Sequence, residues 1–282
     1  RSFLRHRLGL RLDTGAGRLP EAEPFAQDDP LQAYALKQRL FAQLVESDPA
    51  PEADALAQRL LAEGRIAPAA AGRRTVERLR ASLLRARAQW RAWSPDPAQR
   101  IALTLPLRNG QLQGTLQPVH ALGLLQFRPG KPHGRTRLEL ALDRLFWSAS
   151  GETRPVHRLV LEDAAQILPA LPRTRALEAL AVLVELVERS RSEALPLMPR
   201  SAWAYVESLQ RGRSEEEAFT AARACWCDAA WSDGQDRWVR QALRGADPFE
   251  PGNQEQATRF RQLARLLFDT LHESLEPHDV AA

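Results

Sequence analysis

A change of hydrophobic period after residue 98 constrains the fold of this chain more than any other feature. Apolar residues then occupy every second position, as in a strand with one buried face: Ile101, Leu103, Leu105 and Leu107. Asn109 and Gly110 follow, a pair typical of the tight turn of a β-hairpin, and a second strand returns the chain. Pro106 cannot donate a backbone hydrogen bond, which favours an edge strand or a bulge. The sequence therefore predicts a hairpin at the edge of a sheet.

Helical patterns precede this hairpin. Residues 28–47 have Asp29 at the N-cap position and Pro30 at the first helical position, and residues 47–65 and 72–93 are also helical in pattern. The last stretch carries seven arginines and one acid, Glu77. We interpret it as a solvated helix face, with a site for DNA phosphate or an acidic partner as the alternative.

More strands and helices follow the hairpin. We expect strands at 122–128 and 154–163 with a helix at 135–149 between them, and then helices at 173–194, 214–231 and 253–275. The helix at 173–194 is so apolar that we expect much of its circumference to be buried. Ser214 and Glu217 form a capping box. The fold class is therefore α/β or α+β, with a small mixed sheet wrapped by helices before and after.

The chain is expected to contain an N-terminal helical part, a sheet core and a C-terminal helical part, at residues 1–98, 99–165 and 166–282. We expect these parts to form one compact unit, and 282 residues suffice for a sizeable core. The chain begins at Arg1, and Met198 is its only methionine. We therefore expect it to be the C-terminal segment of a longer polypeptide.

Composition favours a soluble cytoplasmic protein without a cofactor. Cys225 and Cys227 are the only cysteines, too few for a disulfide framework and without the second pair that a zinc site needs. No apolar run approaches the length of a membrane span or of a signal peptide. The seven tryptophans are interpreted as core or interface anchors, with stacking platforms for single-stranded bases as the alternative.

The hairpin region lacks acidic residues. No Asp or Glu lies between Asp96 and Glu139, although 35 acids in 282 residues would place about five there. The interval instead contains six basic residues: Arg100, Arg108, Arg128, Lys131, Arg135 and Arg137. A region of this composition can bind anions, but it cannot supply carboxylates to a metal.

Metal-dependent cleavage of a phosphodiester bond requires such carboxylates. One large class of nucleases holds magnesium with an Asp that ends one strand and a (D/E)XK triplet on the next, whose first and third residues share a face. The corresponding triplet here is Gln126, Phe127 and Arg128, and Gln117 stands at the earlier acid position. Amides carry no charge, and a guanidinium keeps its proton, so we predict no metal site and no catalytic residues.

Several segments, in this order, are similar to one known family: "RSFLRHRLGLRL", "EPFAQDDPLQAYALKQRL", "QGTLQPVHALGLLQFRPGK" and "ALDRLFWSASG". The chain resembles the C-terminal domain of RecC, the gamma chain of exodeoxyribonuclease V. The resemblance is firmest over residues 1–45 and 112–151. It implies a PD-(D/E)XK nuclease-like fold that has lost its catalytic acids, within the RecBCD helicase-nuclease, with RecB, RecD and DNA as partners.

The resemblance further implies a role in the repair of double-strand breaks by homologous recombination. In that complex the subunit is the non-catalytic partner that scaffolds two motors and guides DNA strands. For any contact with DNA or another anion, we expect Arg128, Lys131, Arg135 and Arg137. His6 is interpreted as a solvated or capping residue. His120 and His133 are interpreted as surface residues, with contact to DNA phosphate as the alternative.

Two rival functions remain open from sequence. The chain is an active nuclease if its carboxylates have moved to other positions, with Glu139, Asp143, Glu162 and Asp163 as candidates. Alternatively, it is a protein-binding module that does not contact DNA.

Overall fold

The computed structural model describes residues 30–107, 110–161, 163–227 and 232–275. The chain splits into two compact units, Arg1–Arg80 and Ala81–Ala282. This boundary falls inside helix α4 (Ala69–Trp93) and differs from the boundaries at 98 and 165 expected from sequence. The expectation that those three parts form one compact unit stays a prediction.

The first unit contains α2 (Pro30–Glu46), α3 (Ala53–Ala62) and the beginning of α4. Helix α2 begins at Pro30 as predicted, while Asp29 lies outside the described residues. All three helices contribute buried residues to this unit, among them Leu40, Leu44, Leu56, Leu60 and Val76. Arg80 Nε donates to the carbonyl oxygen of Pro51 over 2.8 Å, which ties α4 to the turn before α3.

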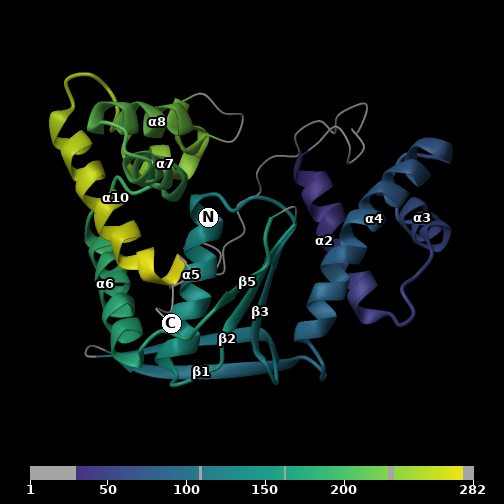
Figure 1. The fold of residues 1–282 in the computed structure, drawn as a ribbon. Coiled ribbons are helices and arrows are strands. Elements are labelled where there is room, and N and C mark those ends of the chain that lie inside the picture. Colours follow the sequence, from purple (N-terminus) through teal and green to yellow (C-terminus); the bar gives the residue numbers. More distant parts are fainter. Residues whose placement is uncertain (1–29, 108–109, 162, 228–231, 276–282) are drawn as a thin grey trace. The chain divides into compact units, whose positions relative to one another are not determined.

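The second unit contains one five-stranded sheet with strand order β1-β2-β3-β4-β5 (Figure 1). The strands are β1 (Gln99–Leu107), β2 (Gly110–His120), β3 (Gly123–Arg128), β4 (Val156–Val160) and β5 (Gln166–Leu168). All neighbours are antiparallel except β3 and β4, which helix α5 (Gly134–Ala149) connects as a crossover. The predicted mixed sheet is therefore confirmed. The sequence did not predict β5, which is only three residues long.

The predicted edge hairpin is confirmed in β1 and β2. Pro106 lies in the edge strand β1, where its missing N–H costs no ladder hydrogen bond. The position of the turn was wrong by one residue, because Gly110 pairs with Leu107 and is the first residue of β2. Residues 108 and 109, which join the strands, are outside the described part of the chain.

Helices cover both faces of the central strands. On one face, α5 packs on the sheet: a Cβ added to Gly114 of β2 would lie 2.7 Å from the ring of Phe146. On the other face, Trp90 of α4 meets Phe127 of β3 edge to face at 6.5 Å between ring centroids. A residue on β3 or β4 therefore faces a helix whichever way its side chain points.

The C-terminal helices share one core with the sheet. They are α6 (Arg173–Ser192), α7 (Pro199–Gln210), α8 (Glu215–Cys227), α9 (Arg237–Ala242) and α10 (Gln254–Leu275). Their common core with the sheet includes Leu124, Trp147, Leu180, Tyr205 and Phe260. The predicted capping box is confirmed, because Ser214 N donates to Glu217 Oε2 over 2.9 Å and Glu217 N donates to Ser214 Oγ over 3.3 Å.

Helix α6 corrects one sequence-based expectation. Only a narrow stripe of it is buried, at Ala176, Leu180, Leu183 and Leu186, whereas Val187 is 55% exposed. The expectation that much of its circumference would be buried was wrong. Helix α6 has more apolar side chains than its neighbours α5 and α10 bury.

Within the described ranges, none of the helices combines the length and the apolar character that crossing a membrane would require.

Candidate functional site: a hydrogen-bonded brace at the triplet

The triplet lies on β3, and its side chains alternate as the sequence predicted. Gln126 and Arg128 contact α5, whereas Phe127 contacts Trp90 of α4 on the opposite face. Gln126 is 5% exposed, so the position where the nuclease pattern has an acid lies in the core.

Both polar atoms of the Gln126 amide form hydrogen bonds. Its Nε2 donates to the carbonyl oxygen of Leu140 over 3.1 Å and, more weakly, to Asp143 Oδ2 over 3.4 Å. Its Oε1 accepts a hydrogen bond from Arg158 Nε over 3.1 Å. Arg158 stands directly opposite Gln126 in the register of β3 and β4. The triplet position is thus joined to both α5 and the neighbouring strand.

Arg158 extends this network to the end of the last helix. It is 5% exposed, and its Nη1 donates to the carbonyl oxygen of Leu275, the last residue of α10, over 3.1 Å. The final carbonyl groups of a helix lack intrahelical partners, and cations are favourable near them. Arg158 therefore caps α10 and holds Gln126 at the same time.

Arg144 of α5 is a second buried cap for the same helix. It is fully buried, and its Nη1 donates to the carbonyl oxygen of Glu273 over 3.1 Å. Its Nε and Nη2 donate to the carbonyl oxygen of Pro169 over 3.2 and 2.8 Å. Burial lowers the pKa of Arg144 to about 10, which leaves it charged at neutral pH. We call Gln126, Asp143, Arg144 and Arg158 the brace.

Asp143 is the carboxylate of the brace. Burial raises its pKa, although the hydrogen bond from Gln126 and the charge of Arg128 act in the opposite direction. A carboxyl group in this environment binds its proton more tightly than an exposed one.

The predicted anion-binding residues are largely occupied by contacts within the chain. Arg128 Nη2 donates to Glu139 Oε2 over 3.3 Å, and Arg135 Nε donates to Glu139 Oε1 over 3.3 Å. Arg137 stacks its guanidinium on the Trp203 ring at 4.1 Å. Glu139 therefore neutralises part of the charge that the sequence alone made available to DNA.

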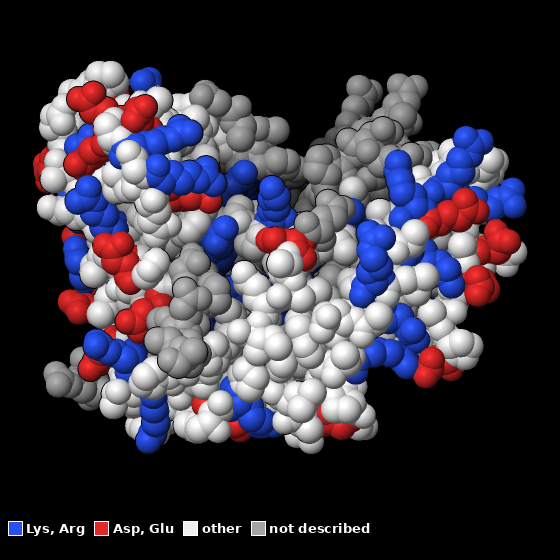
Figure 2. Space-filling model, viewed as in Figure 1, with Lys and Arg blue, Asp and Glu red and all other residues white. Residues whose placement is uncertain are grey.

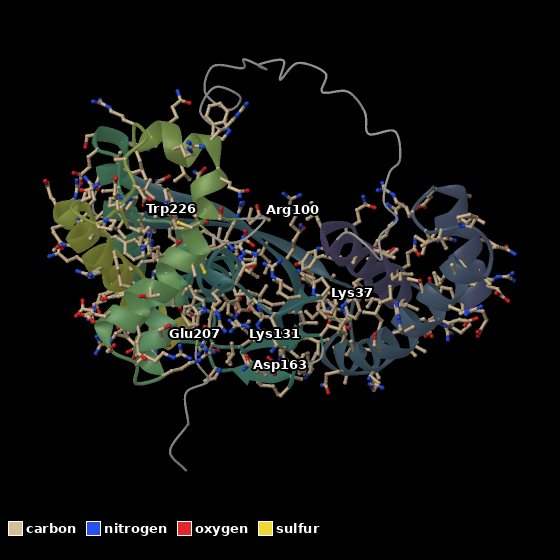
Figure 3. The ribbon with its side chains drawn as sticks, turned by 90° about the horizontal axis from the view of Figure 1, so that it is seen from above. Lys37, Arg100, Lys131, Asp163, Glu207 and Trp226 are labelled. Carbon is tan, nitrogen blue, oxygen red and sulfur yellow. The ribbon has the colours of Figure 1, made fainter. Side chains whose placement is uncertain are left out.

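Lys131 and Arg135 are the most accessible of these four residues. Lys131 is exposed in the loop after β3, and the Arg135 side chain is 75% exposed. Figure 3 shows Lys131 and Asp163 on one side of the molecule, as expected for loops that follow the parallel strands β3 and β4. Burial and the charge of Arg200 lower the pKa of the nearby His133, which favours its neutral form.

Gln117 does not join Gln126 in a pocket. It is exposed on β2, while Gln126 is buried. The pairing of β2 with β3 is confined to Val119 with Leu124 and His120 with Gly123, and the register of β1 with β2 shifts between Gln99 and Ile101. The sequence assigns Gln117 to the earlier acid position of the nuclease pattern, and this assignment stays a prediction.

The acids of the rival nuclease hypothesis lie in different environments. Glu139 pairs with two arginines, Asp143 belongs to the brace, and exposed Asp163 accepts a hydrogen bond from Ala164 N over 2.8 Å. Glu162 is outside the described residues. Among the described residues, no three His, Cys, Asp or Glu side chains are grouped as a metal site would need.

The sequence did not identify Arg144 and Arg158 as functional candidates. Both lie in otherwise apolar patterns of a helix and a strand, and nothing local distinguishes a buried arginine from an exposed one. One signal could have identified Arg158: it is a charged residue within the strand "VHRLV", and every position of this strand is buried in the structure.

Comparison with known proteins identifies the family. Residues 1–210 match the sequence model described as the RecC C-terminal domain. The chain belongs to the RecC C-terminal domain family. It is 24% identical over 266 residues to the RecBCD enzyme subunit RecC of Escherichia coli (strain K12). That alignment covers 88% of this chain but 23% of the RecC subunit, so the chain spans less than a quarter of its relative.

The RecC C-terminal domain match contains β1 to β5 and α5 to α7, and therefore the brace side chains. Helix α10, whose end the brace holds, lies beyond residue 210. The brace thus connects the part of the chain that matches the family model to a helix outside it.

Proposed function

We propose that this chain is a non-catalytic domain of a RecC-type subunit of the RecBCD helicase-nuclease, exodeoxyribonuclease V. It would act as a scaffold and DNA-guiding element in the repair of double-strand breaks by homologous recombination, in the cytoplasm. Its partners would be RecB- and RecD-type subunits and DNA. The membership of the RecC C-terminal domain family supports this assignment.

The brace is the observation that carries the non-catalytic part of the proposal. A catalytic carboxylate must face the substrate, whereas Gln126 is 5% exposed and hydrogen-bonded on both sides. The bonds that its amide makes join α5 to Arg158 of β4, and Arg158 in turn binds the end of α10. Such contacts suit a residue that stabilises the fold.

The residues at the triplet do not fit a magnesium ion. Magnesium is bound by anionic oxygens and retains several water molecules. Gln126 Oε1 instead accepts from the Arg158 guanidinium, and Arg128 lies two residues further along the same strand. These fixed positive charges oppose a divalent cation, so we assign no metal and no cofactor to this chain.

The sheet itself is consistent with a PD-(D/E)XK nuclease-like ancestry. The altered triplet lies on a central strand, after a hairpin and before a crossover helix to a parallel strand. Alternation on this strand still directs the first and third triplet residues to one face. We propose that this framework has kept its geometry and exchanged metal chemistry for internal hydrogen bonds.

The DNA-guiding part of the proposal rests on Lys131 and Arg135, the most exposed of the four predicted cations. Figure 2 shows basic and acidic side chains interspersed over α6, α8 and α10, which does not favour a broad DNA surface there. We therefore expect DNA contact to be weak and confined to the loop between β3 and α5.

The test combines DNA binding with charge reversal. Binding of labelled forked DNA to the purified chain is measured by fluorescence anisotropy at several salt concentrations. We expect the unaltered chain to bind DNA weakly, with an affinity that decreases as the salt concentration rises. The affinity of K131E/R135E should be lower by a further factor of about 3–10, as expected for the loss of two phosphate contacts. R240E, a reversal at an exposed arginine on α9, is the matched control.

Binding that is insensitive to salt and equal in K131E/R135E and R240E would leave the protein-binding module as the better description. Mg²⁺- or Mn²⁺-dependent cleavage by the chain, abolished by changes at Glu139, Asp143 or Asp163, would favour the active nuclease instead.

A further inference from the structure

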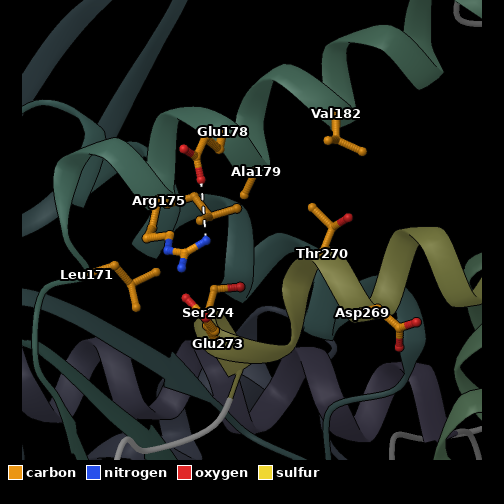
Figure 4. A pocket seen from close by; sticks show the side chains of 10 residues that line it. Leu171, Arg175, Glu178, Ala179, Val182, Asp269, Thr270, Glu273 and Ser274 are labelled. Atoms are coloured by element: carbon orange, nitrogen blue, oxygen red, sulfur yellow. Dashed lines mark ion pairs between the residues drawn. The ribbon is translucent and has the colours of Figure 1, made fainter.

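A groove of about 230 Å³ lies between α6 and α10, on a surface that the proposed DNA contact does not use. Leu145 of α5 and Leu171 provide buried apolar atoms at its base, and Ala179 and Val182 of α6 line it further. Figure 4 shows Thr270 of α10 facing Val182 across it. Leu266, one helical turn before Thr270, is 40% exposed and extends the apolar surface along α10.

The rim of the groove is acidic. Glu178, Asp269 and Glu273 supply three carboxylates against one guanidinium, that of Arg175. Arg175 pairs with Glu178 at 3.6 Å, the ion pair drawn in Figure 4, and both side chains are about two-thirds exposed. Exposed pairs of this kind hold their partners weakly. The groove therefore keeps an excess of negative charge.

Two of these acids are placed unfavourably for the isolated chain. Asp269 and Glu273 are four residues apart on one face of α10, and neither carboxylate forms an ion pair with a described residue. Like charges at this spacing repel, and Glu273 in the last turn also opposes the helix dipole, which the charge of the buried Arg144 offsets in part. A positively charged partner would remove both penalties.

We propose that this groove binds a basic amphipathic helix of a RecB- or RecD-type subunit. Its apolar side chains would pack on Leu145, Leu171 and Val182, and its Arg or Lys side chains would reach Asp269 and Glu273. The inference rests on the proposed scaffold function and names the surface and the partner chemistry for it. The groove is smaller than the usual pocket for a small molecule, and its acidic rim repels DNA.

A bound helix explains how a narrow groove can hold a partner subunit. An amphipathic helix places anchors at every third or fourth residue, so it makes several contacts along a groove between two helices. Arg and Lys also lay their aliphatic stems on apolar surface while their charges stay in solvent at the rim. The exposed Leu266 offers the next contact along α10.

The experiment reconstitutes the full 282-residue chain with purified RecB- and RecD-type subunits of the same organism. Affinity is measured by biolayer interferometry for the unaltered chain, D269K/E273K and L266S. We expect D269K/E273K to weaken binding at least tenfold and L266S to weaken it several-fold. The control E216K/E255K reverses two exposed acids on α8 and at the start of α10, and should bind like the unaltered chain.

A neutral variant separates binding from folding. D269N/E273Q removes the repulsion on α10, so we expect its melting temperature to rise slightly while its affinity for the subunits falls. A structural role alone would move both quantities in the same direction.

The outcomes distinguish the two proposals. If the unaltered chain binds neither subunit, the scaffold function fails, and this inference fails with it. If the chain binds but D269K/E273K, D269N/E273Q and E216K/E255K all match it, the scaffold function stands and the groove assignment is wrong.

Discussion

Replacing Arg158 with methionine tests the brace directly. R158M removes the donors to Gln126 Oε1 and to the Leu275 carbonyl oxygen, both at 3.1 Å in a buried environment. Each buried acceptor left without a partner costs about 1–3 kcal/mol. Methionine offsets part of this loss, because it packs well and removes the cost of burying a charge. We therefore expect a net loss of about 2–4 kcal/mol of unfolding free energy.

The assay is thermal unfolding of the full chain, followed by circular dichroism. For a unit of roughly 150–250 residues, each kcal/mol lowers the melting temperature by about 2–4 °C, so we expect a fall of about 4–16 °C. R100M is the matched control, since Arg100 is exposed on β1 of the same sheet; its effect should stay within about 0.5 kcal/mol. Hydrogen exchange at residues 271–275 should also become faster in R158M. Equal melting temperatures for R158M and R100M, with unchanged exchange, would refute the brace.

Three further predictions concern buried polar groups. Burial raises the pKa of Asp143, so the fold loses stability as the pH rises from the ordinary aspartate range towards the raised pKa of this group. The gain in stability from D143N, measured by urea unfolding, should therefore be larger at pH 7 than at pH 4. Burial lowers the pKa of His157, whose ring lies tilted at 43° to the Trp93 ring with 4.8 Å between the ring centroids. The stability of the unaltered chain should therefore fall as pH drops below about 6.5, and H157N should flatten this dependence; equal slopes would contradict it. Q126E, which restores an acid to the triplet, loses the donor to Leu140 and repels Asp143, so it should lower stability by about 1–3 kcal/mol; a more stable Q126E would oppose this view.

Local patterns predicted the secondary structure well. The alternation at residues 101–107 and the capping box at Ser214 depend on neighbours in sequence, and both are confirmed. Strand β5 has three residues and no period to detect. The burial of α6 was overestimated, because the fraction of its surface that is buried depends on how α5 and α10 pack against it.

The candidate site was predictable only in part. The triplet on β3 and the alternation of Gln126 with Phe127 followed from strand geometry. The brace depends on contacts between residues far apart in sequence, such as Arg158 with Leu275, which no local pattern records. Composition alone could not show where the Gln117 side chain points, because the register of β1 with β2 shifts close to it.

On our proposal, internal hydrogen bonds have replaced a metal site at the triplet. Its most direct test is a crystal of the chain soaked in Mn²⁺, with anomalous scattering measured at the manganese edge. The account predicts no manganese peak beside Gln126, Asp143 or Arg158, and an intact bond between Gln126 and Arg158. A peak between these side chains, with DNA cleavage by the same preparation, would contradict it.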